Sequence, residues 1–342
     1  MTLVRSLNYK ETMKHQKQKV VTIGGGSGQF VLLSGLKDLE DIEITAVVSM
    51  VDSGGSTGRL RHELGTLPPG DALKCILALS PYQEIARNIL LKRFVNDRRL
   101  LGHNAGNMLL TMLSQYTGSF PSAVQALAEI LDVCGTILPV TVDRATLVAE
   151  LTDGTRIYGQ TAIDIPQGTQ RGKIRDVFLV PHYSDSISVY PPVIEAVHDS
   201  NYIIIGPGDL FTSILPNLVV PGVKEAIQNT GASVLYCVNI MTKFGETHNF
   251  NGRDFVSKLE ECINRPVDGV IYNTGKPEEK LLEQYREQKA EFVEINGNDK
   301  WLEGRRLYAS DILDISGGIV RHNSKKLANL IRKIIFQNSI HQ

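Results

Sequence analysis

The chain has 342 residues, of which 42% are hydrophobic and 21% are charged. This length and composition indicate a globular protein with a sizeable core, in one large domain or two closely packed ones. The formal net charge of −1 lacks the basic excess that broad binding to nucleic acid or anionic membranes requires. We therefore expect no nucleic-acid partner, and no apolar run approaches the ~20 residues of a membrane span.

Four cysteines are spread along the chain, without a C-x-x-C pair or a histidine at metal-ligand spacing. Cys75, Cys134, Cys237 and Cys262 each lie in an apolar run, which predicts small core residues. Such usage is typical of a reducing compartment, and the basic N-terminus lacks the apolar run of a secretory signal. We therefore expect a cytoplasmic location.

The predicted elements begin after a polar, lysine-rich segment. Residues 1–18 are expected to form a disordered or weakly ordered tail without a function, and Met13 offers an alternative start. Residues 19–342 are predicted to form a single nucleotide-binding domain. Apolar, β-branched runs predict strands at 20–23, 42–50, 202–205, 233–240 and 269–272. Helices are predicted at 30–39, 71–79, within 81–116 and 121–134, and at 192–199, 223–229, 253–263, 276–288 and 323–336.

This alternation of strands and helices predicts a three-layer αβα Rossmann-like fold with a mostly parallel sheet. One segment departs from the pattern. Two strand-like runs flank Asp153-Gly154, a dipeptide that favours a tight hairpin turn. We therefore predict a small antiparallel excursion at about 137–182 within the single domain.

A glycine-rich loop separates the first predicted strand from the first predicted helix. Its sequence is Gly24-Gly25-Gly26-Ser27-Gly28, and at such a junction backbone amides and the helix N-terminus can hold an anion. The loop matches neither the dinucleotide fingerprint G-x-G-x-x-G nor a Walker loop. The alternatives are a phosphate site and a tight turn that binds nothing.

A second loop, at 52–61, directly follows the second predicted strand. The acid at its start stands about where a ribose-binding carboxylate lies in nucleotide folds. The glycines and hydroxyls after it can form a nest of donors for phosphate, and the arginines at its end can clamp the same group. The candidate ligand-binding residues of this loop are Asp52, Ser53, Gly54, Gly55, Ser56, Thr57 and Arg59, with Arg61 beside them. The alternative is an ordinary surface loop.

Asp71 follows Pro68-Pro69-Gly70 and has two predicted roles. As the N-cap of the next helix it would stabilise that helix by ~1 kcal/mol. As a second acid near Asp52 it would help to hold Mg²⁺ on a diphosphate, because Mg²⁺ takes few carboxylates besides phosphate oxygens. The two roles do not exclude each other.

Three later loops carry further polar side chains. In the segment 102–107, Asn107 is a candidate contact to a base, ribose or sugar, whereas we predict helix capping for Asn104 and a structural role for His103. The loops at 206–213 and 239–247 follow parallel strands, where open α/β sheets bind ligands. Their candidate residues are Gly206, Gly208, Asp209, Asn239, Thr242 and Glu246. For Asp209 and Glu246 the alternative role is helix capping.

Together these motifs resemble one family, the YvcK-type gluconeogenesis factors, within the wider superfamily of 2-phospho-L-lactate transferases. The resemblance covers about residues 19–336. The motifs that carry it are Ile23-Gly-Gly-Gly-Ser-Gly28, the loop 52–61, Pro69-Gly70-Asp71, Gly102-His103 with Gly106-Asn107, the loop 206–213 with Pro216-Asn217, Asn239-x-Met241-Thr242 with Gly245-Glu246-Thr247, and the segment 317–322.

The resemblance implies a Rossmann-like core and a nucleotide ligand. The transferase branch moves a phospholactyl group from a guanine-diphosphate carrier, with Mg²⁺ held by aspartate. YvcK-type members are cytoplasmic, bind UDP-N-acetylglucosamine and are associated with growth on gluconeogenic carbon sources, cell shape and peptidoglycan synthesis. By this resemblance the two glycine-rich loops hold the diphosphate, and the residues at the sugar and base ends are Asn217, Asn239, Thr242 and Arg321.

Two positions depart from the family pattern. Many relatives carry a second aspartate where this chain has Ser53, which weakens the case for a metal-dependent transferase unless Asp71 compensates. Lys243 stands where glutamine is common, so the ligand contacts of that loop are expected to differ.

The leading hypothesis is a UDP-sugar-binding regulatory protein whose ligand state is read by a protein partner in cell-wall or carbon regulation. One alternative is a transferase of a nucleotide-diphosphate-linked group, in which Asp52 and Asp71 hold Mg²⁺. A second alternative is an NAD-binding protein, which the imperfect glycine fingerprint disfavours. We expect no catalysed reaction, and base rates favour a homodimer.

Overall fold

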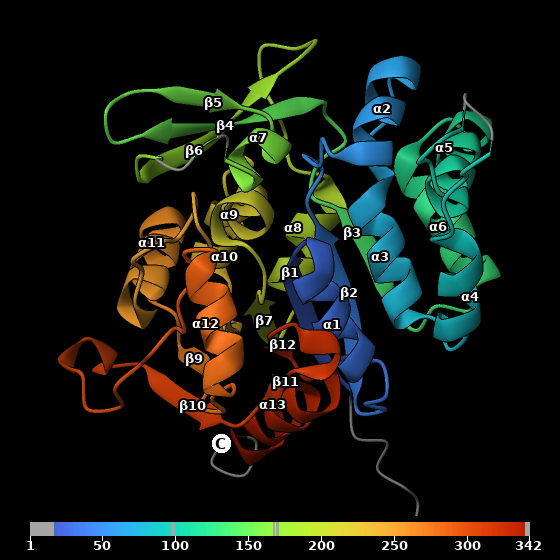
Figure 1. Cartoon of the computed structure of the whole chain (residues 1–342). Coiled ribbons are helices and arrows are strands. Elements are labelled where there is room, and N and C mark those ends of the chain that lie inside the picture. The colour runs from blue at the N-terminus through green and yellow to red at the C-terminus, as the bar shows by residue number, and fades with distance from the viewer. Residues whose placement is uncertain (1–16, 97–99, 167, 169–170, 339–342) are drawn as a thin grey trace, which may run out of the picture.

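The polypeptide forms three layers, with helices on both sides of a central sheet and a smaller sheet at one end (Figure 1). The computed structural model describes residues 17–96, 100–166, 168 and 171–338. Of the tail predicted at 1–18, residues 1–16 lie outside the described residues, and the first strand begins at Gln18. The predicted αβα fold class is confirmed.

Within the described residues, the central sheet has seven strands in the order β10-β9-β8-β7-β1-β2-β3. Every neighbouring pair is parallel. The chain builds outward from β1 to β3 on one side and from β7 to β10 on the other, so the winding reverses between β1 and β7. In open α/β sheets such a switch point opens a crevice at the carboxyl ends of the strands. The strands are β1 (Gln18–Gly24), β2 (Ile42–Val48), β3 (Thr136–Pro139), β7 (Tyr202–Ile205), β8 (Ser233–Cys237), β9 (Gly269–Asn273) and β10 (Arg306–Ser310).

Alternate residues of β1 enter two separate cores, one on each face of the sheet. Val20 packs in the core covered by α1 (Gly26–Leu36), α3 (Pro69–Leu79) and α13 (Ser324–Asn338). Val21 and Ile23 pack in the other core. That core is covered by α8 (Pro191–His198), α9 (Leu215–Leu218), α10 (Val223–Asn229) and α11 (Gly252–Ile263). Burial on both faces explains why these strands are continuous apolar runs.

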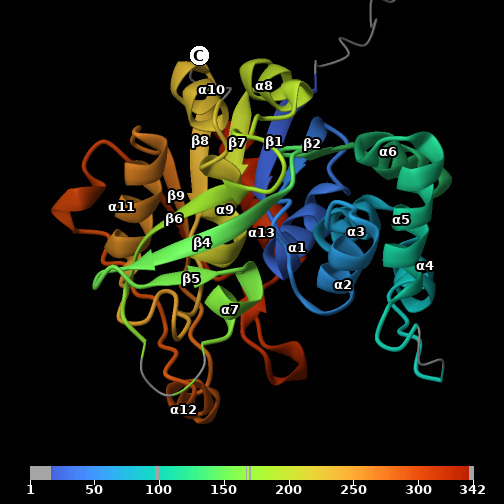
Figure 2. The same cartoon turned by 90° about the horizontal axis from the view of Figure 1, so that it is seen from above.

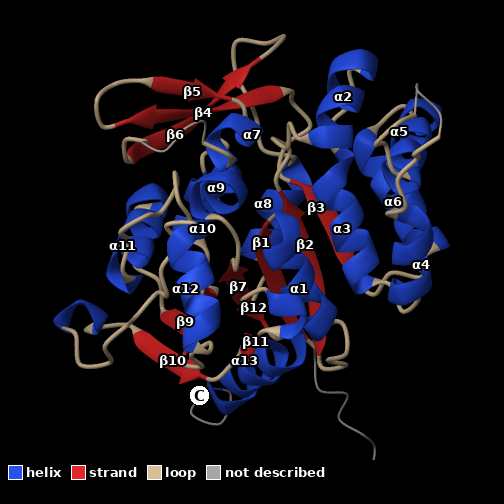
Figure 3. Cartoon of the chain, in the orientation of Figure 1, coloured by secondary structure: helices blue, strands red, loops and turns tan. Residues whose placement is uncertain are grey.

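More helices lie at the edges of these layers (Figure 3). They are α2 (Gly55–Leu64), α4 (Gln83–Leu90), α5 (Ala105–Thr117), α6 (Phe120–Ile130) and α12 (Glu279–Glu287). Among the described residues, no single helix is long and apolar enough to cross a membrane. Only as a pair, bent by 73°, do Leu210–Leu218 and Val223–Asn229 reach that length and composition.

The predicted hairpin forms a three-stranded antiparallel sheet that lies across the second core (Figure 2). Its strands, in the order β5-β4-β6, are β4 (Ala145–Leu151), β5 (Arg156–Tyr158) and β6 (Ile174–Pro181), and α7 (Gln160–Asp164) lies between β5 and β6 in sequence. The excursion is shorter than predicted, because Thr136–Pro139 pairs in parallel with β2 at the edge of the main sheet. A two-stranded hairpin, β11 (Leu313–Asp314) with β12 (Arg321–His322), precedes α13.

Several predicted boundaries differ from the structure, mostly at the ends of strands and helices. The first helix begins at Gly26, inside the glycine loop, instead of at residue 30. The second strand of the second half, β8, ends at Cys237 rather than at residue 240, which leaves Asn239 in a loop. The prediction of core cysteines holds for Cys75 and Cys237 but is wrong for Cys134, which is exposed.

Candidate functional site

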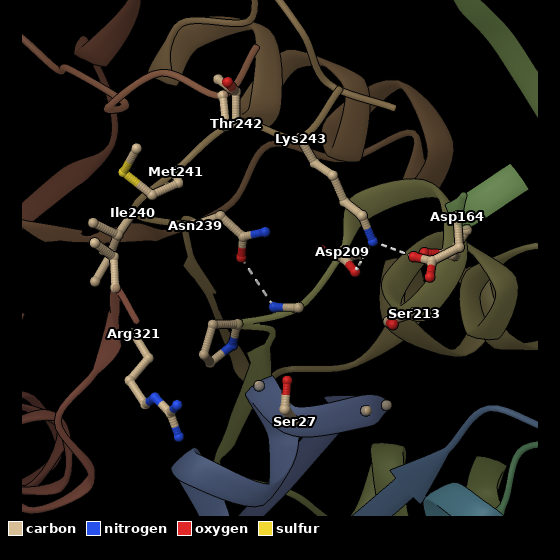
Figure 4. Close-up of a pocket in the computed structure, with 18 of the residues that line it drawn as sticks. Ser27, Asp164, Asp209, Ser213, Asn239, Ile240, Met241, Thr242, Lys243 and Arg321 are labelled. Atoms are coloured by element: carbon tan, nitrogen blue, oxygen red, sulfur yellow. Dashed lines mark hydrogen bonds and ion pairs between the residues drawn. The ribbon is translucent and has the colours of Figure 1, made fainter. Parts of the chain in front are cut away.

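A cavity of about 910 Å³ lies at the carboxyl ends of β1, β7 and β8. Its walls come from the loops that follow these strands, from α3, from the end of α7 and from the segment around β12. It therefore occupies the switch point between β1 and β7, where the two halves of the sheet part. Figure 4 shows Arg321 and Lys243 approaching it from different sides, with Ser27 on the end of α1 between them.

The floor of the cavity is the N-terminal end of α1. Gly25, Gly26, Ser27 and Gly28 all line it. Gly25 holds the N-cap position and no side chain accepts a hydrogen bond there, so first-turn amides remain available to an anion. Gly26 has φ +63, a conformation that favours glycine.

A pair of carboxylates borders this helix end. Asp52 accepts a hydrogen bond from the amide of Gly54 (2.8 Å), and Asp71 accepts one from the Nζ of Lys74 (2.9 Å). All three charged side chains line the cavity. Burial, and then the charge of Asp71, raise the pKa of the Asp52 carboxyl. A positive ligand group or a cation placed here would relieve that repulsion.

Asp71 is not the N-cap of α3, so that prediction is wrong. The helix begins at Pro69, and its N-cap residue, Pro68, makes no side-chain hydrogen bond. Asp71 therefore lies inside the first turn, where its negative charge interacts favourably with the helix dipole. A Cβ on Gly25 would lie 2.8 Å from its Oδ2 atom, so the glycine lets this carboxylate approach the first loop.

On the other side of the cavity, Lys243 lies among three carboxylates. Its Nζ bonds Asp164, lies 2.8 Å from Asp209 Oδ2 and lies 3.3 Å from Glu246 Oε1. Burial opposes the charge of Lys243, but these carboxylates outweigh it and raise its pKa. Asp164 comes from α7 of the antiparallel excursion, whereas Asp209 and Glu246 come from loops of the main sheet. Lys243 therefore links the antiparallel excursion to the loops that follow β7 and β8.

Glu246 is buried and accepts hydrogen bonds from the hydroxyl of Thr212 at 3.1 Å. Burial, followed by the charge of Asp209, raises the pKa of its carboxyl to about 8. Its side chain therefore serves as a partner of Thr212 and Lys243, and it does not cap a helix. Asp209 precedes the π-helical turn Leu210–Ile214 without capping it through its side chain.

We expect Glu246→Gln to flatten the pH dependence of stability between pH ~6.5 and ~8. The folded carboxyl, with a pKa of about 8 against an ordinary 4.5, keeps a proton that the unfolded chain releases. Stability therefore falls as pH rises through this window. Burial lowers the pKa of His103, His182, His248 and His322 from the ordinary 6.5, which gives an opposite slope at the lower end of the window, and this slope is shared by the wild type and Glu246→Gln.

Urea unfolding at pH ~6.5 and at pH ~8 measures this change in the free energy of unfolding. Between them the wild type is expected to lose about 1.5 kcal/mol more stability than Glu246→Gln. Glu287→Gln, at an exposed position, is the matched control and should keep the wild-type slope. A wild-type slope in Glu246→Gln would contradict the assignment of the proton to this residue.

The remaining wall carries Asn239, Thr242 and Arg321. Asn239 Oδ1 accepts a hydrogen bond from the amide of Gly208 (3.1 Å), whereas its Nδ2 donates to none of the described residues and faces the cavity in Figure 4. Thr242 is held by Glu291, whose amide donates to the threonine Oγ1 (2.8 Å). Arg321 is exposed and forms no ion pair within the described ranges, so its charge is available to a ligand.

Other predicted residues lie behind the cavity wall or beside it. Among the described residues that line the cavity, none comes from the segment 53–59 or is Asn107. Ser56 Oγ lies 2.9 Å from His103 Nδ1, and the Nδ2 of Asn107 donates to Ser56 Oγ and Thr57 Oγ1 at 3.3 Å. The guanidinium of Arg59 bonds the carbonyl of Leu101. Gly54 and Gly55 begin α2, and Ser53 Oγ accepts from the amide of Thr161 (3.1 Å).

Three further candidates support the backbone of the loops. Asn217 is fully buried, and its Nδ2 donates to the carbonyls of Gly24 (3.1 Å) and Ser213 (2.8 Å). These two bonds of Asn217 hold the first glycine loop and the loop after β7 together. In the loop after β7, Gly206 has φ +74 and is followed by a cis peptide bond to Pro207. Asn104 caps α5 as predicted, because its Oδ1 accepts from the amide of Asn107 (2.7 Å).

Three charged residues of the cavity, Lys74, Asp164 and Lys243, were not among the predicted site residues. Lys74 interrupts the apolar run 72–79, a signal that could have marked it. Asp164 lies in the antiparallel excursion and has no local signal, because only the fold brings it to Lys243. Phe244 and Tyr285 also line the cavity and give one part of it an aromatic surface.

Comparison with known proteins agrees with this fold. A family model described as "2-phospho-L-lactate transferase CofD" matches residues 20–313, so the chain belongs to the CofD family. A relative in Thermotoga maritima is 40% identical, over 92% of this chain and 99% of its own length. A relative in Listeria innocua is 37% identical, over 93% and 96%. Both carry "gluconeogenesis factor" in their names, and they place the chain in that group of the family.

A solved structure has the same fold. The crystal structure of a UPF0052-family protein from Bacillus halodurans is 34% identical, covers 92% of this chain and 99% of its own, and superposes with a TM-score of 0.85. The likeness therefore extends over most of both chains.

Proposed function

We propose that this protein is a cytoplasmic regulator of growth on gluconeogenic carbon sources, and that it binds a UDP-sugar such as UDP-N-acetylglucosamine in the 910 Å³ cavity. One observation carries the proposal. The open N-terminal end of α1 and the unpaired guanidinium of Arg321 border the same cavity. Backbone amides at a helix N-terminus and a bidentate arginine are the groups that hold a diphosphate.

The charges of the cavity wall make Arg321 important. The charged side chains that line it are Asp52, Asp71, Asp164, Asp209, Lys74, Lys243 and Arg321. Lys74 is paired with Asp71, and Lys243 with Asp164 and Asp209. Arg321 is therefore the cation in the described wall that retains its full charge for a ligand. Asn239 and Thr242 supply polar groups for the sugar, and the volume is within the range of ligand sites.

The proposed output is a shift between protein states that a partner in carbon or cell-wall regulation recognises. A ligand shifts such an equilibrium only by as much as its affinities for the two states differ. Lys243 and its partners Asp164 and Asp209 form a suitable element for such a shift, because they join the antiparallel excursion to loops that border the proposed ligand. Control of cell shape and peptidoglycan supply would follow from sensing a UDP-sugar.

A second candidate function is a Mg²⁺-dependent transferase acting on a nucleotide-diphosphate-linked group. The observation that favours it is the pair Asp52 and Asp71, which line the cavity together, where burial, and then the charge of Asp71, raise the pKa of Asp52. Their oxygen donors suit Mg²⁺. A bound Mg²⁺ would supply charge neutralisation for the diphosphate, while Lys74 already bonds one oxygen of Asp71.

The test is isothermal titration calorimetry of the full chain with UDP-N-acetylglucosamine, GDP and NAD, each with and without Mg²⁺. We expect the UDP-sugar to bind without Mg²⁺, and Arg321→Ala to weaken it by about 10-fold or more. Arg59→Ala is the matched control and should bind like the wild type, because Arg59 lies outside the cavity.

The other outcomes separate the candidates. A preference for GDP that requires Mg²⁺, lost in Asp52→Asn, would favour the transferase. NAD binding alone would replace the UDP-sugar with another diphosphate ligand. Full UDP-sugar affinity in Arg321→Ala, or loss in Arg59→Ala, would contradict the placement of the diphosphate.

A further inference from the structure

Basic side chains from three separate parts of the chain gather beside the cavity. We call them the basic rim. They are Arg171 and Lys173 between α7 and β6, His248 in the loop after β8, and Lys289 after α12. None of the four lines the cavity, but Pro166 and Phe244, which lie next to them, do. The basic rim therefore borders the cavity without belonging to its lining.

Direct contacts place two of these side chains around Phe244. The Nζ of Lys289 lies 4.5 Å from the centroid of the Phe244 ring. The rings of Phe244 and His248 have their centroids 5.6 Å apart. Lys289 is exposed and His248 is half-buried, so the two basic groups stand beside the same aromatic part of the cavity wall.

The loop after β8 and the end of α7 meet at this place. A Cβ on Gly245 would lie 2.6 Å from the Cγ of Pro166, which follows α7. Arg171 is anchored at the same helix end, because its Nη1 donates to the carbonyls of Ala162 (3.1 Å) and Ile163 (2.8 Å). These bonds fix the guanidinium as a positive charge beside the loop after β8.

The basic rim lacks a full counter-charge. Residues 165–173 contain no acid. Burial lowers the pKa of Arg171, and the charge of Glu246 counteracts this, but Glu246, with a pKa of about 8, is mostly protonated near neutral pH. Burial, followed by the charges of the other three basic residues, lowers the pKa of His248. The described surroundings of His248 are therefore positive, and a partly buried charge normally has a counter-ion.

Three nitrogen atoms of the basic rim also lack hydrogen-bond partners. Within the described part of the chain, Nε and Nη2 of Arg171 and Nδ1 of His248 are buried and bond to nothing. Buried polar groups are nearly always hydrogen-bonded. An oxyanion supplies several acceptor sites together with negative charge, and the fork of a guanidinium matches carboxylate and phosphate oxygens.

We propose that the basic rim is a second anion subsite, which takes a carboxylate or phosphate group at the edge of the cavity. The anion has two possible sources. One is an acidic group on the sugar of the nucleotide ligand, and this source rests on the proposed function. The other is a free phosphate or carboxylate ion that binds beside the nucleotide. Both sources supply the charge and the acceptors that the basic rim lacks.

Titration of the full chain with inorganic phosphate tests the subsite without a nucleotide. Chloride keeps the ionic strength constant, so that screening does not change. The readout is the NMR ring signal of His248, assigned with His248→Gln. We expect phosphate to shift this signal and to raise the pKa of His248, because a nearby anion favours the charged imidazolium. Lys173→Glu, at an exposed position, should abolish the shift.

The matched control is Lys333→Glu, which makes the same change of charge at an exposed position on α13 and should respond like the wild type. Arg171→Met is the second variant, and thermal melting checks its fold because it also loses the bonds to α7. A His248 signal that phosphate leaves unchanged would overturn the proposal. So would a shift that persists in both Lys173→Glu and Arg171→Met.

Calorimetry with UDP-glucuronate and UDP-glucose separates the two sources, since a carboxylate on the sugar distinguishes these ligands. If the anion belongs to the nucleotide ligand, UDP-glucuronate should bind about 5-fold or more tightly than UDP-glucose, and Lys173→Glu should remove this preference. Equal affinities, together with the phosphate-induced shift, identify a free anion as the source. If neither UDP-sugar binds but phosphate still shifts the His248 signal, the proposed function fails and the second anion subsite stands.

Discussion

Gly28→Ala is expected to lower the free energy of unfolding by about 3 kcal/mol or more. Gly28 lies in the first turn of α1, and a Cβ there would lie 2.2 Å from the carbonyl oxygen of Pro207 and 2.6 Å from its carbonyl carbon. Both are backbone atoms, so no side-chain rotation relieves the overlap. The helix or the loop after β7 must move, and both border the cavity.

Urea unfolding and ligand calorimetry measure the two consequences together. The variant should unfold at lower urea and bind the proposed nucleotide ligand more weakly, because the end of α1 that lines the cavity is displaced. Gly231→Ala is the control, since a Cβ at that position has open space around it and its backbone is not left-handed. A Gly28→Ala protein as stable as Gly231→Ala would show that the close approach of α1 and Pro207 is not needed.

Lys243→Met is expected to cost about 2–3 kcal/mol near neutral pH. Loss of one partner from a buried ion pair typically costs 3–5 kcal/mol, and the side chain of Lys243 is 34% exposed, which reduces the value. Without the ammonium, Asp164 and Asp209 face each other and Glu246 with no cation between them. The nearest oxygens of the three groups lie within 4.8 Å of one another, so Asp164 and Asp209 repel each other strongly, while Glu246, whose pKa is raised to about 8, stays mostly protonated near neutral pH.

Two comparisons isolate this cluster in urea unfolding. Lys276→Met removes the exposed pair with Glu294 and should change stability by less than about 1 kcal/mol. Lys243→Met combined with Asp209→Asn should recover part of the loss, because one unpaired charge is removed. Equal effects of Lys243→Met and Lys276→Met would contradict a central role of Lys243. Limited proteolysis of Lys243→Met should also cleave the excursion faster, since Asp164 is no longer tied down.

Much of the fold could be predicted from local patterns. The runs at 20–23 and 202–205 are apolar and β-branched because both faces of these strands are buried. The Asp153-Gly154 turn likewise marked the antiparallel hairpin. The strand Arg306–Ser310 was missed, because it lies at the edge of the sheet and is only partly buried. Thr136–Pro139 was missed as a parallel strand because four residues are too few to show a repeating hydrophobic pattern.

The candidate site divides in the same way. The glycine loop at 24–28 and the loops after β7 and β8 were found from the sequence, since glycine-rich turns after parallel strands are local features. The segment 53–59 has the same composition, yet the structure directs Ser56 and Arg59 toward His103 and Leu101. Composition does not say which side of a loop faces the cavity. That depends on where α2 and α5 pack.

The sequence by itself determined the class of fold, the position of the glycine-rich loops that border the cavity and the membership of the CofD family, because these rest on short-range patterns. Only the tertiary structure decided which charges meet. It brings Asp164 to Lys243, across 79 positions of the chain, and brings Arg321 of the C-terminal hairpin to the end of α1. Such contacts depend on how distant elements pack, and no local residue pattern records them.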